Sequence, residues 1–158
     1  MKQRRIEEED LGPMKLIFNY ENVFYSFFYD DISGCIHRSR EYAMNYVYSG
    51  EMILDNGKQQ IHVGKGECVY IPRDHHITMY KRTFNGERYC GIFLNFTRNF
   101  LREMYAKFGQ CKIPADTSKL KPEVIKLPKT AEITSLFASL TPFFDPEVKP
   151  RDDFMHLK

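Results

Sequence analysis

The feature that most constrains this fold is a series of short apolar segments, separated by glycine turns, that runs from Tyr42 to Phe96. Asn56 and Gly57 predict a tight hairpin, with a type I′ turn that needs positive φ at both central residues. The continuous apolar run Cys68–Ile71, which Pro72 ends, is typical of a fully buried strand. The expected strands are Tyr42–Ser49, Glu51–Leu54, Gln59–Val63, Cys68–Ile71, Ile77–Arg82 and Arg88–Phe96. Short, evenly spaced strands of this kind indicate a β-barrel or a sandwich.

Downstream of this block the apolar residues follow a helical period. Thr97 is a suitable N-cap and Gly109 stands where a C′ glycine belongs, so the sequence predicts a helix between them. Thr130 begins a second helical pattern whose end Pro142 weakens, and Asp152 begins a third. The apolar positions are Leu101, Met104, Tyr105 and Phe108 in the first pattern, and Ile133, Leu136, Phe137, Leu140 and Phe144 in the second. The sequence therefore predicts two or three α-helices after the strands.

Upstream, the bulky segments Met14–Tyr20 and Val23–Tyr29 have a strand-like composition, and Cys35–Arg40 leads from them into the block. A short strand is also expected near Ile125. We therefore expect a flexible N-terminal arm (residues 1–13), a β-barrel (residues 14–96) and a helical dimerisation and linker region (residues 97–158). No stop signal closes the last helical pattern before Lys158, so we expect the natural protein to continue.

Charge and composition exclude several classes of protein. The formal net charge is only +2 and the basic residues are scattered, which argues against a nucleic-acid-binding face on this chain. No apolar run is long enough to span a membrane, and the charged N-terminus is unlike a signal peptide, so we expect a cytoplasmic protein. The four cysteines form no Cys-x-x-Cys pair and are expected to be reduced. The sequence contains no catalytic motif that we recognise, and no catalytic residue or cofactor is predicted.

The Tyr42–Ser49 strand has two unequal faces, because side chains alternate along a strand. One face is bulky, whereas the other carries Ala43, Asn45 and Val47, and Gly91 is also small. Small side chains that face inward would leave room for a ligand, with Asn45 as its polar contact; a plain packed core explains them equally well. Several basic residues flank the strands and would suit an anionic ligand or a solvated rim: Arg38, Arg40, Arg73, Lys81, Arg82 and Arg88.

The sequence resembles the N-terminal, cupin-like domain of the AraC/XylS family of bacterial transcription regulators, and within it the ExsA-like branch. The resemblance rests on the segments Tyr46–Gly50, Val63–Glu67 and Val69–Pro72, and on the strand Ile92–Phe96 that runs directly into a helix. It implies a mainly β fold: a cupin-like (double-stranded β-helix) barrel that senses a signal, followed by α-helices that dimerise. A helix-turn-helix DNA-binding domain, which this chain does not contain, would follow in the full-length family.

The resemblance also implies a set of ligand-contacting positions inside the barrel. These are Ala43, Ile77, Met79, Gly91 and Phe93. Their mostly apolar side chains make a sugar a poor candidate, and leave an apolar molecule, a protein effector or no ligand as the alternatives. We expect a homodimer, with Ile133, Leu136, Phe137, Leu140 and Phe144 as its apolar seam, and contact with DNA only through the absent C-terminal domain.

Two alternatives remain open at this point. The first is a metal-dependent cupin enzyme, in which Cys35, His37, Glu41 and either His75 or His76 would bind Zn, Fe or Ni. This ligand set is incomplete, and surface histidines with a buried cysteine explain it better, so no metal is predicted. The second alternative is a stand-alone cupin that binds a small molecule and has no role in DNA binding.

Overall fold

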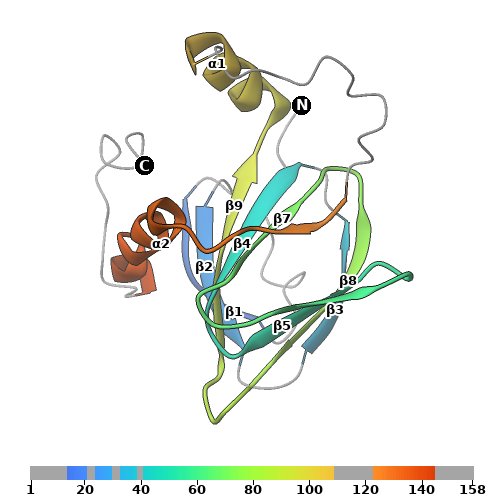
Figure 1. Ribbon diagram of the computed structural model, residues 1–158. Coiled ribbons are helices and arrows are strands. Elements are labelled where there is room, and N and C mark those ends of the chain that lie inside the picture. Colours follow the sequence, from blue (N-terminus) through green and yellow to red (C-terminus); the bar gives the residue numbers. More distant parts are fainter. Residues whose placement is uncertain (1–13, 21–23, 30–32, 39–40, 109–122, 145–158) are drawn as a thin grey trace.

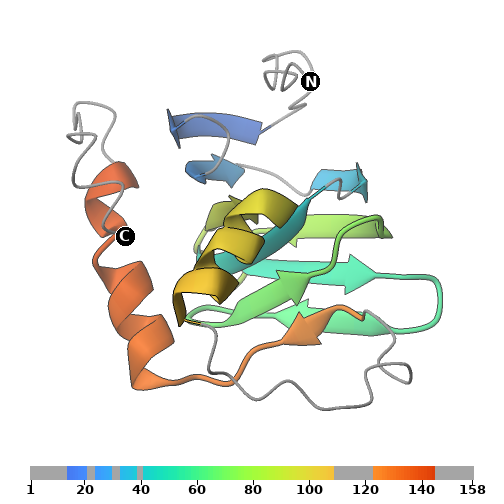
Figure 2. The same cartoon turned by 90° about the horizontal axis from the view of Figure 1, so that it is seen from above.

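The computed structural model describes residues 14–20, 24–29, 33–38, 41–108 and 123–144. These residues form two antiparallel sheets that face each other (Figures 1 and 2). The larger sheet has the strand order β1-β2-β9-β4-β7-β10, and the smaller one β3-β8-β5-β6. The strands are β1 (Met14–Tyr20), β2 (Phe24–Tyr29), β3 (Ser33–Arg38), β4 (Tyr42–Ser49), β5 (Glu51–Asp55), β6 (Gln60–Val63), β7 (Cys68–Ile71), β8 (His76–Arg82), β9 (Tyr89–Phe96) and β10 (Ile125–Lys126). The expected mainly β, cupin-like barrel is confirmed.

Most of the expected strands are present within a residue or two of their expected ends. β3 is a strand where the sequence suggests only a connection, because Cys35–Arg40 ends in polar residues. Its backbone pairs with β8, so that Cys35 lies opposite Met79 and His37 opposite Ile77. β10 pairs with β7 and thus extends the larger sheet with residues from the region after the first helix.

The Asn-Gly hairpin is present, but its turn differs from the expected one. Gly57 has a φ of 83°, whereas Asn56 does not adopt a positive φ, so the turn is not type I′. The loop instead spans residues 56–59 between β5 and β6, and side chains close it. The Asp55 carboxylate accepts a hydrogen bond from Gly57 N, and the Asn56 side chain accepts from the amides of the next loop residues, Lys58 and Gln59. These local bonds favour a longer loop over the two-residue turn.

Gly50 marks the corner at which the chain crosses from the larger sheet (β4) to the smaller one (β5). Its φ is 70°, in the left-handed region that glycine tolerates best. A Cβ at this position would lie 2.6 Å from Tyr89 Cα and 2.8 Å from Arg82 O, both backbone atoms. The close approach of three strands therefore requires glycine here.

Two hydrophobic clusters lie on opposite sides of the larger sheet. The first fills the barrel between the sheets, and the second lies between the outer face of the larger sheet and the helix α2 (Figure 1). The buried members of the first are Ala43, Val47, Met52, Leu54, Val63, Val69, Ile71, Ile77, Met79, Tyr89, Phe93 and Val124. Those of the second are Tyr46, Cys68, Ile92, Phe137, Leu140 and Phe143. β4 and β9 thus contribute alternate residues to both clusters, as the period of a strand requires.

The helices α1 (Arg98–Phe108) and α2 (Ala131–Ala138) lie where the sequence predicts them. The Thr97 hydroxyl accepts a hydrogen bond from Phe100 N, so the expected N-cap is confirmed; the Thr130 hydroxyl caps α2 in the same way by accepting from Ile133 N. A short 3₁₀ helix, η2 (Thr141–Phe144), follows α2 where Pro142 interrupts the α-helical pattern. The third expected helix, from Asp152, lies outside the described residues. No helix in the described segments has the length and apolar character needed to cross a membrane.

Candidate functional site

The ligand positions expected from the sequence come together inside the barrel. Ala43 and Asn45 are on β4, Ile77 and Met79 on β8, and Gly91 and Phe93 on β9. All six residues are buried, and each of the five that has a side chain is at most 3% exposed. The inward orientation of the small face of β4 is therefore confirmed. Whether these residues contact a ligand stays a prediction.

Polar side chains of Asn45, Lys81 and Tyr89 are buried within this apolar interior. The Tyr89 hydroxyl donates a hydrogen bond to Asn45 Oδ1 over 3.0 Å, and Asn45 Nδ2 donates to the Ile92 carbonyl over 3.1 Å. Lys81 is only 3% exposed, and its Nζ lies 5.5 Å from the ring centroid of Phe93 and 6.0 Å from that of Tyr89. These distances are within the range of cation–π attraction. The apolar interior thus also contains the amine of Lys81 and a hydrogen-bonded amide.

The space above Gly91 is occupied by a neighbouring side chain. A Cβ built on Gly91 would lie 2.4 Å from the Tyr89 hydroxyl oxygen and 2.9 Å from Cζ of the same ring. The phenol of Tyr89 therefore folds back over Gly91 and reaches Asn45 and Met52 Sδ, which is 3.8 Å from the hydroxyl. The small size of Gly91 makes room for Tyr89 rather than for an empty cavity.

Sequence reasoning does not single out Tyr89, and it names Lys81 only among the flanking basic residues that would suit either an anionic ligand or a solvated rim. A signal for Lys81 is nevertheless available, because it follows Ile77 and Met79 at a spacing of two and so shares their inward face. Among the other flanking basic residues, Arg82 points to the opposite face, as the alternation of side chains requires. The fold of Tyr89 over Gly91 has no signal in the sequence.

The residues expected to form a dimer seam pack against the barrel of their own chain. Phe137 and Leu140 are 0% and 2% exposed within the second cluster, and Ile133, Leu136 and Phe144 are partly buried against it. The Phe137 ring stacks on Tyr46 at a centroid distance of 4.3 Å. Tyr48 donates a hydrogen bond of 2.5 Å to the carbonyl oxygen of the same phenylalanine. Burial raises the pKa of Tyr48 strongly, so its hydroxyl remains a donor.

The metal ligands suggested by the sequence lie only partly among the described side chains. Among those residues, no group of three or more His, Cys, Asp or Glu side chains is placed to hold a metal. The side chains of Cys35 and His37 lie outside that set. His76 is exposed at the start of β8, and the His75 ring contacts the Arg73 carbonyl at 3.2 Å.

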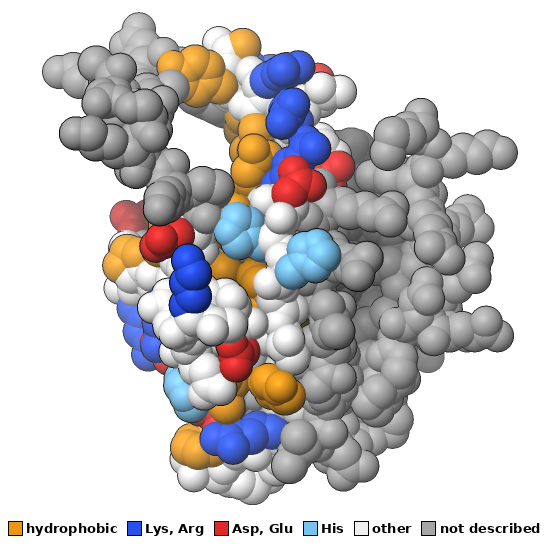
Figure 3. Space-filling view, turned by 90° about the vertical axis from the view of Figure 1, so that its right-hand side faces the viewer, with side chains coloured by type: hydrophobic (Ala, Val, Ile, Leu, Met, Phe, Trp, Pro, Cys, Tyr) orange, Lys and Arg blue, Asp and Glu red, His pale blue; other side chains and the backbone are white. Residues whose placement is uncertain are grey.

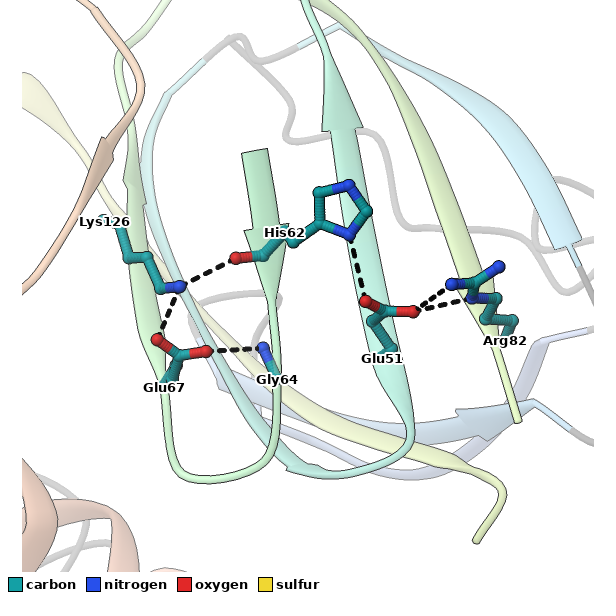
Figure 4. Close-up of polar contacts among 6 residues, drawn as sticks. All are labelled: Glu51, His62, Gly64, Glu67, Arg82 and Lys126. Carbon is teal, nitrogen blue, oxygen red and sulfur yellow. Dashed lines mark hydrogen bonds and ion pairs between the residues drawn. The ribbon is translucent and has the colours of Figure 1, made fainter. Parts of the chain in front are cut away.

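A polar network crosses the outer face of the smaller sheet (Figure 4). The Glu51 carboxylate on β5 accepts a hydrogen bond of 2.6 Å from Arg82 Nε on β8, and lies 3.0 Å from His62 Nδ1 on β6. The hydrogen bond from His62 and the charge of Arg82 hold the pKa of Glu51 below its ordinary value, against the opposing effect of burial. One carboxylate thus ties three strands together.

A second contact joins the edges of the two sheets (Figure 4). Lys126 Nζ on β10 lies 2.5 Å from the Glu67 carboxylate and donates a hydrogen bond of 2.9 Å to the His62 carbonyl on β6. Glu67 also accepts a hydrogen bond from Gly64 N. We call these contacts the Lys126 clamp. It closes the seam between β6 and β10, each the last strand of its sheet.

The Glu51 network predicts a pH dependence of stability. Because the folded pKa of Glu51 lies below its ordinary value of 4.5, its stabilisation is present above that pH and is lost as the pH falls through the lowered folded pKa. We expect Glu51→Gln to lower the free energy of unfolding by about 1 kcal/mol at pH 7, and by less below pH 4.5. Urea unfolding over a pH series measures this difference. Glu87→Gln, which removes a more exposed ion pair with Lys65, is the control; a difference constant with pH would contradict the assignment.

Residues 42–158 match the family model of the ExsA N-terminal regulatory domain, a match that covers most of the chain. The chain belongs to this family. As an ExsA-type domain it is the signal-sensing regulatory domain of an AraC-type transcription regulator. A search of curated proteins finds no significant match.

Solved structures support the fold of this ExsA-type domain. An apo form of ToxT from Vibrio cholerae strain SCE256 matches with a TM-score of 0.62 at 9% identity, over 85% of this chain and 52% of that one. A second ToxT structure from Vibrio cholerae gives 0.59 at 11% identity, over 85% and 51%. ToxT of strain SCE256 with a bound unsaturated fatty acid gives 0.55 at 8% identity, over 78% and 46%. The domain thus spans about half the length of the ToxT chains, and at these identities the likeness shows the fold alone.

On the ExsA-type domain the exposed large apolar residues lie partly on α1. Phe100, Leu101 and Tyr105 are 43%, 39% and 49% exposed. Figure 3 shows hydrophobic and basic side chains next to one another on this helix, at the top of the face in view. The apolar side of α2, in contrast, is turned toward the barrel.

Proposed function

We propose that this chain is the effector-binding half of a longer AraC-type regulator, and that its barrel takes an apolar molecule with one acidic group. The observation that carries the proposal is Lys81, an ammonium group buried on the same inward face as Ile77 and Met79. Ligand chambers are mostly apolar, with a few polar groups that fix orientation. An apolar lining with a buried cation suits an amphiphilic anion better than a sugar.

The ToxT structures favour the same chemistry. ToxT has been solved with an unsaturated fatty acid and with (E)-4-(8-methylnaphthalen-1-yl)but-3-enoic acid, and both are carboxylic acids with an apolar body. We infer a ligand of this class for the chamber around Asn45, Lys81 and Phe93, with Ala43, Ile77, Met79 and Gly91 as further lining residues. DNA would be bound by a C-terminal domain of the full-length protein. A protein effector is the alternative, and it requires no ligand in the barrel.

Self-association is part of the proposal. Dimers of helix-turn-helix proteins bind paired half-sites, and a homodimer of this domain would bring two DNA-binding parts together in this way. The proposed seam on α2 is largely buried within the chain, so a second copy would reach only its exposed edge unless the helix moves. The homodimer therefore stays a prediction.

The affinity for a fatty acid tests the proposed ligand. We expect cis-9-hexadecenoate to bind the wild-type chain saturably, and Lys81→Met to weaken binding at least tenfold, because the charged contact is lost while the apolar stem is kept. The methyl ester of the same acid should bind both proteins weakly and about equally. Isothermal titration calorimetry below the aggregation concentration of the acid measures these affinities.

The control is Lys58→Met, which removes an exposed lysine from the loop between β5 and β6 and should leave binding unchanged. Circular dichroism establishes that each variant is folded. Equal affinity for acid and ester, or no saturable binding by the wild type, would rule out an acidic ligand in the chamber and leave the protein effector.

A further inference from the structure

Tyr89 is a central side chain of the barrel interior, and an occupant of the barrel would have to displace it. The Tyr89 phenol lies over Gly91, between Asn45 and Met52, in the middle of the proposed chamber. Lys81, the proposed contact for an acidic group, lies beside the same ring. A molecule that brings its acid group to Lys81 therefore competes with the phenol for space.

Movement of Tyr89 would break a fully buried hydrogen bond. Asn45 is 0% exposed and uses both ends of its amide: Oδ1 accepts from Tyr89, and Nδ2 donates to the Ile92 carbonyl. A buried amide that loses one partner has a strong tendency to reorient, because an unsatisfied buried acceptor costs about 1–3 kcal/mol. The bond from Asn45 to Ile92 therefore depends on the position of Tyr89.

The backbone held by this amide is the part of the sheet that carries α2. Ile92 lies opposite Tyr46 in the register of β9 and β4, and both side chains point outward into the second cluster. Tyr46 stacks on Phe137 of α2. Two residues further along, where the register shifts between Val47 and Ser49, Tyr48 donates a hydrogen bond to the Phe137 carbonyl of α2. Along this stretch of β4 the inward side chains therefore contact the barrel interior, and the outward side chains contact α2.

We propose that Tyr89 couples the binding of a molecule in the barrel to the packing of α2 on the outer face of the sheet. When the phenol lies over Gly91, the hydrogen bonds from Tyr89 to Asn45 and from Asn45 to Ile92 fix β4 against β9, and α2 is held on the outer face. When a bound molecule displaces the phenol, Asn45 loses its hydrogen bond from Tyr89 and can reorient away from Ile92. β4 is then held less firmly against β9, and α2 packs less tightly on the sheet. This inference rests on the proposed function, since it names the residue that responds to a ligand in the same chamber.

The experiment uses a reporter on the outer side of the sheet. The chain contains no tryptophan, so Phe144→Trp places a single fluorophore against Tyr48, which Phe144 contacts edge-on at a centroid distance of 4.8 Å. In this background we expect Tyr89→Phe and Tyr89→Ala to raise the acrylamide quenching constant of Trp fluorescence at least twofold under conditions where the protein is folded. The matched control is Val69→Ala, which shortens a buried side chain of the same cluster and the same sheet that is not among the proposed ligand contacts.

The outcomes separate this inference from the proposed ligand. A rise for both Tyr89 variants and not for Val69→Ala supports the coupling, even if no fatty acid binds. If phenol, the group that Tyr89→Ala removes, restores the low quenching of this variant, the support is direct. Equal quenching for Tyr89→Phe and the parent, or an equal rise for Val69→Ala, would show that Tyr89 is only a core residue. Should Tyr89→Ala fail to fold, Tyr89→Phe, which keeps the ring, still decides.

Discussion

Replacing Gly50 with alanine is expected to lower the free energy of unfolding by at least about 4 kcal/mol, close to the limit of what one substitution does in a small domain. Two effects combine. The residue has a φ of 70°, which costs an L-residue about 1–2 kcal/mol. The new methyl group would also lie 2.6 Å from Tyr89 Cα and 2.8 Å from Arg82 O, and no side-chain rotation relieves a contact with backbone.

Gly57→Ala separates these two effects. Gly57 has a φ of 83°, but no heavy atom lies within 4 Å of the place that a Cβ would take, so only the backbone strain of about 1 kcal/mol applies. Urea unfolding of both variants followed by circular dichroism gives the comparison. If Gly50→Ala costs no more than Gly57→Ala, the close approach of β4, β8 and β9 at this corner is not as described.

The second large effect is expected at α2. Phe137 is fully buried, stacks on Tyr46 and belongs to the cluster that attaches the helix to the sheet. Phe137→Ala should lower the free energy of unfolding by about 3–5 kcal/mol, because the lost burial is joined by the cost of a cavity. α2 is short, and a helix of this length depends on packing for its stability. We therefore expect the variant to lose helical signal in circular dichroism before the sheets unfold.

Phe100→Ala is the matched control for this prediction. Phe100 also lies on a helix and contacts one ring, that of Phe96 at a centroid distance of 5.8 Å, but it is 43% exposed. Its loss should cost about 1 kcal/mol or less. Equal costs for the two phenylalanines, measured by urea unfolding, would mean that α2 is not anchored to the barrel in solution.

The strands and turns are encoded locally, so the sequence pattern predicts a β-barrel or a sandwich, and the family resemblance selects the barrel. The glycine turns, the alternation on β4 and the threonine caps of both helices each depend on neighbours in the chain. β3 escapes prediction because its pattern is short and mixed, and pairing with β8 decides it. The turn at Asn56 differs because side-chain hydrogen bonds of Asp55 and Asn56 compete with the type I′ geometry.

The site is predictable only in part, for a different reason. Alternation identifies which residues of a strand face inward, and it places Lys81 inside as readily as Ile77. What fills the interior depends on side-chain conformations across strands, and the fold of Tyr89 over Gly91 is of that kind. In the same way, the apolar period of α2 predicts a buried face without saying what covers it. The sequence suggests a second copy, whereas the structure shows the chain's own sheet.

The Lys126 clamp has a consequence for aggregation. β6 and β10 are the end strands of their sheets, and an end strand with free carbonyls is a template on which a foreign strand can add. The Lys126 ammonium already occupies the His62 carbonyl, and its charge lies where an incoming strand would need an apolar or neutral neighbour. The Lys126 clamp, which joins β6 to β10, therefore also hinders the addition of a foreign strand at these two end strands.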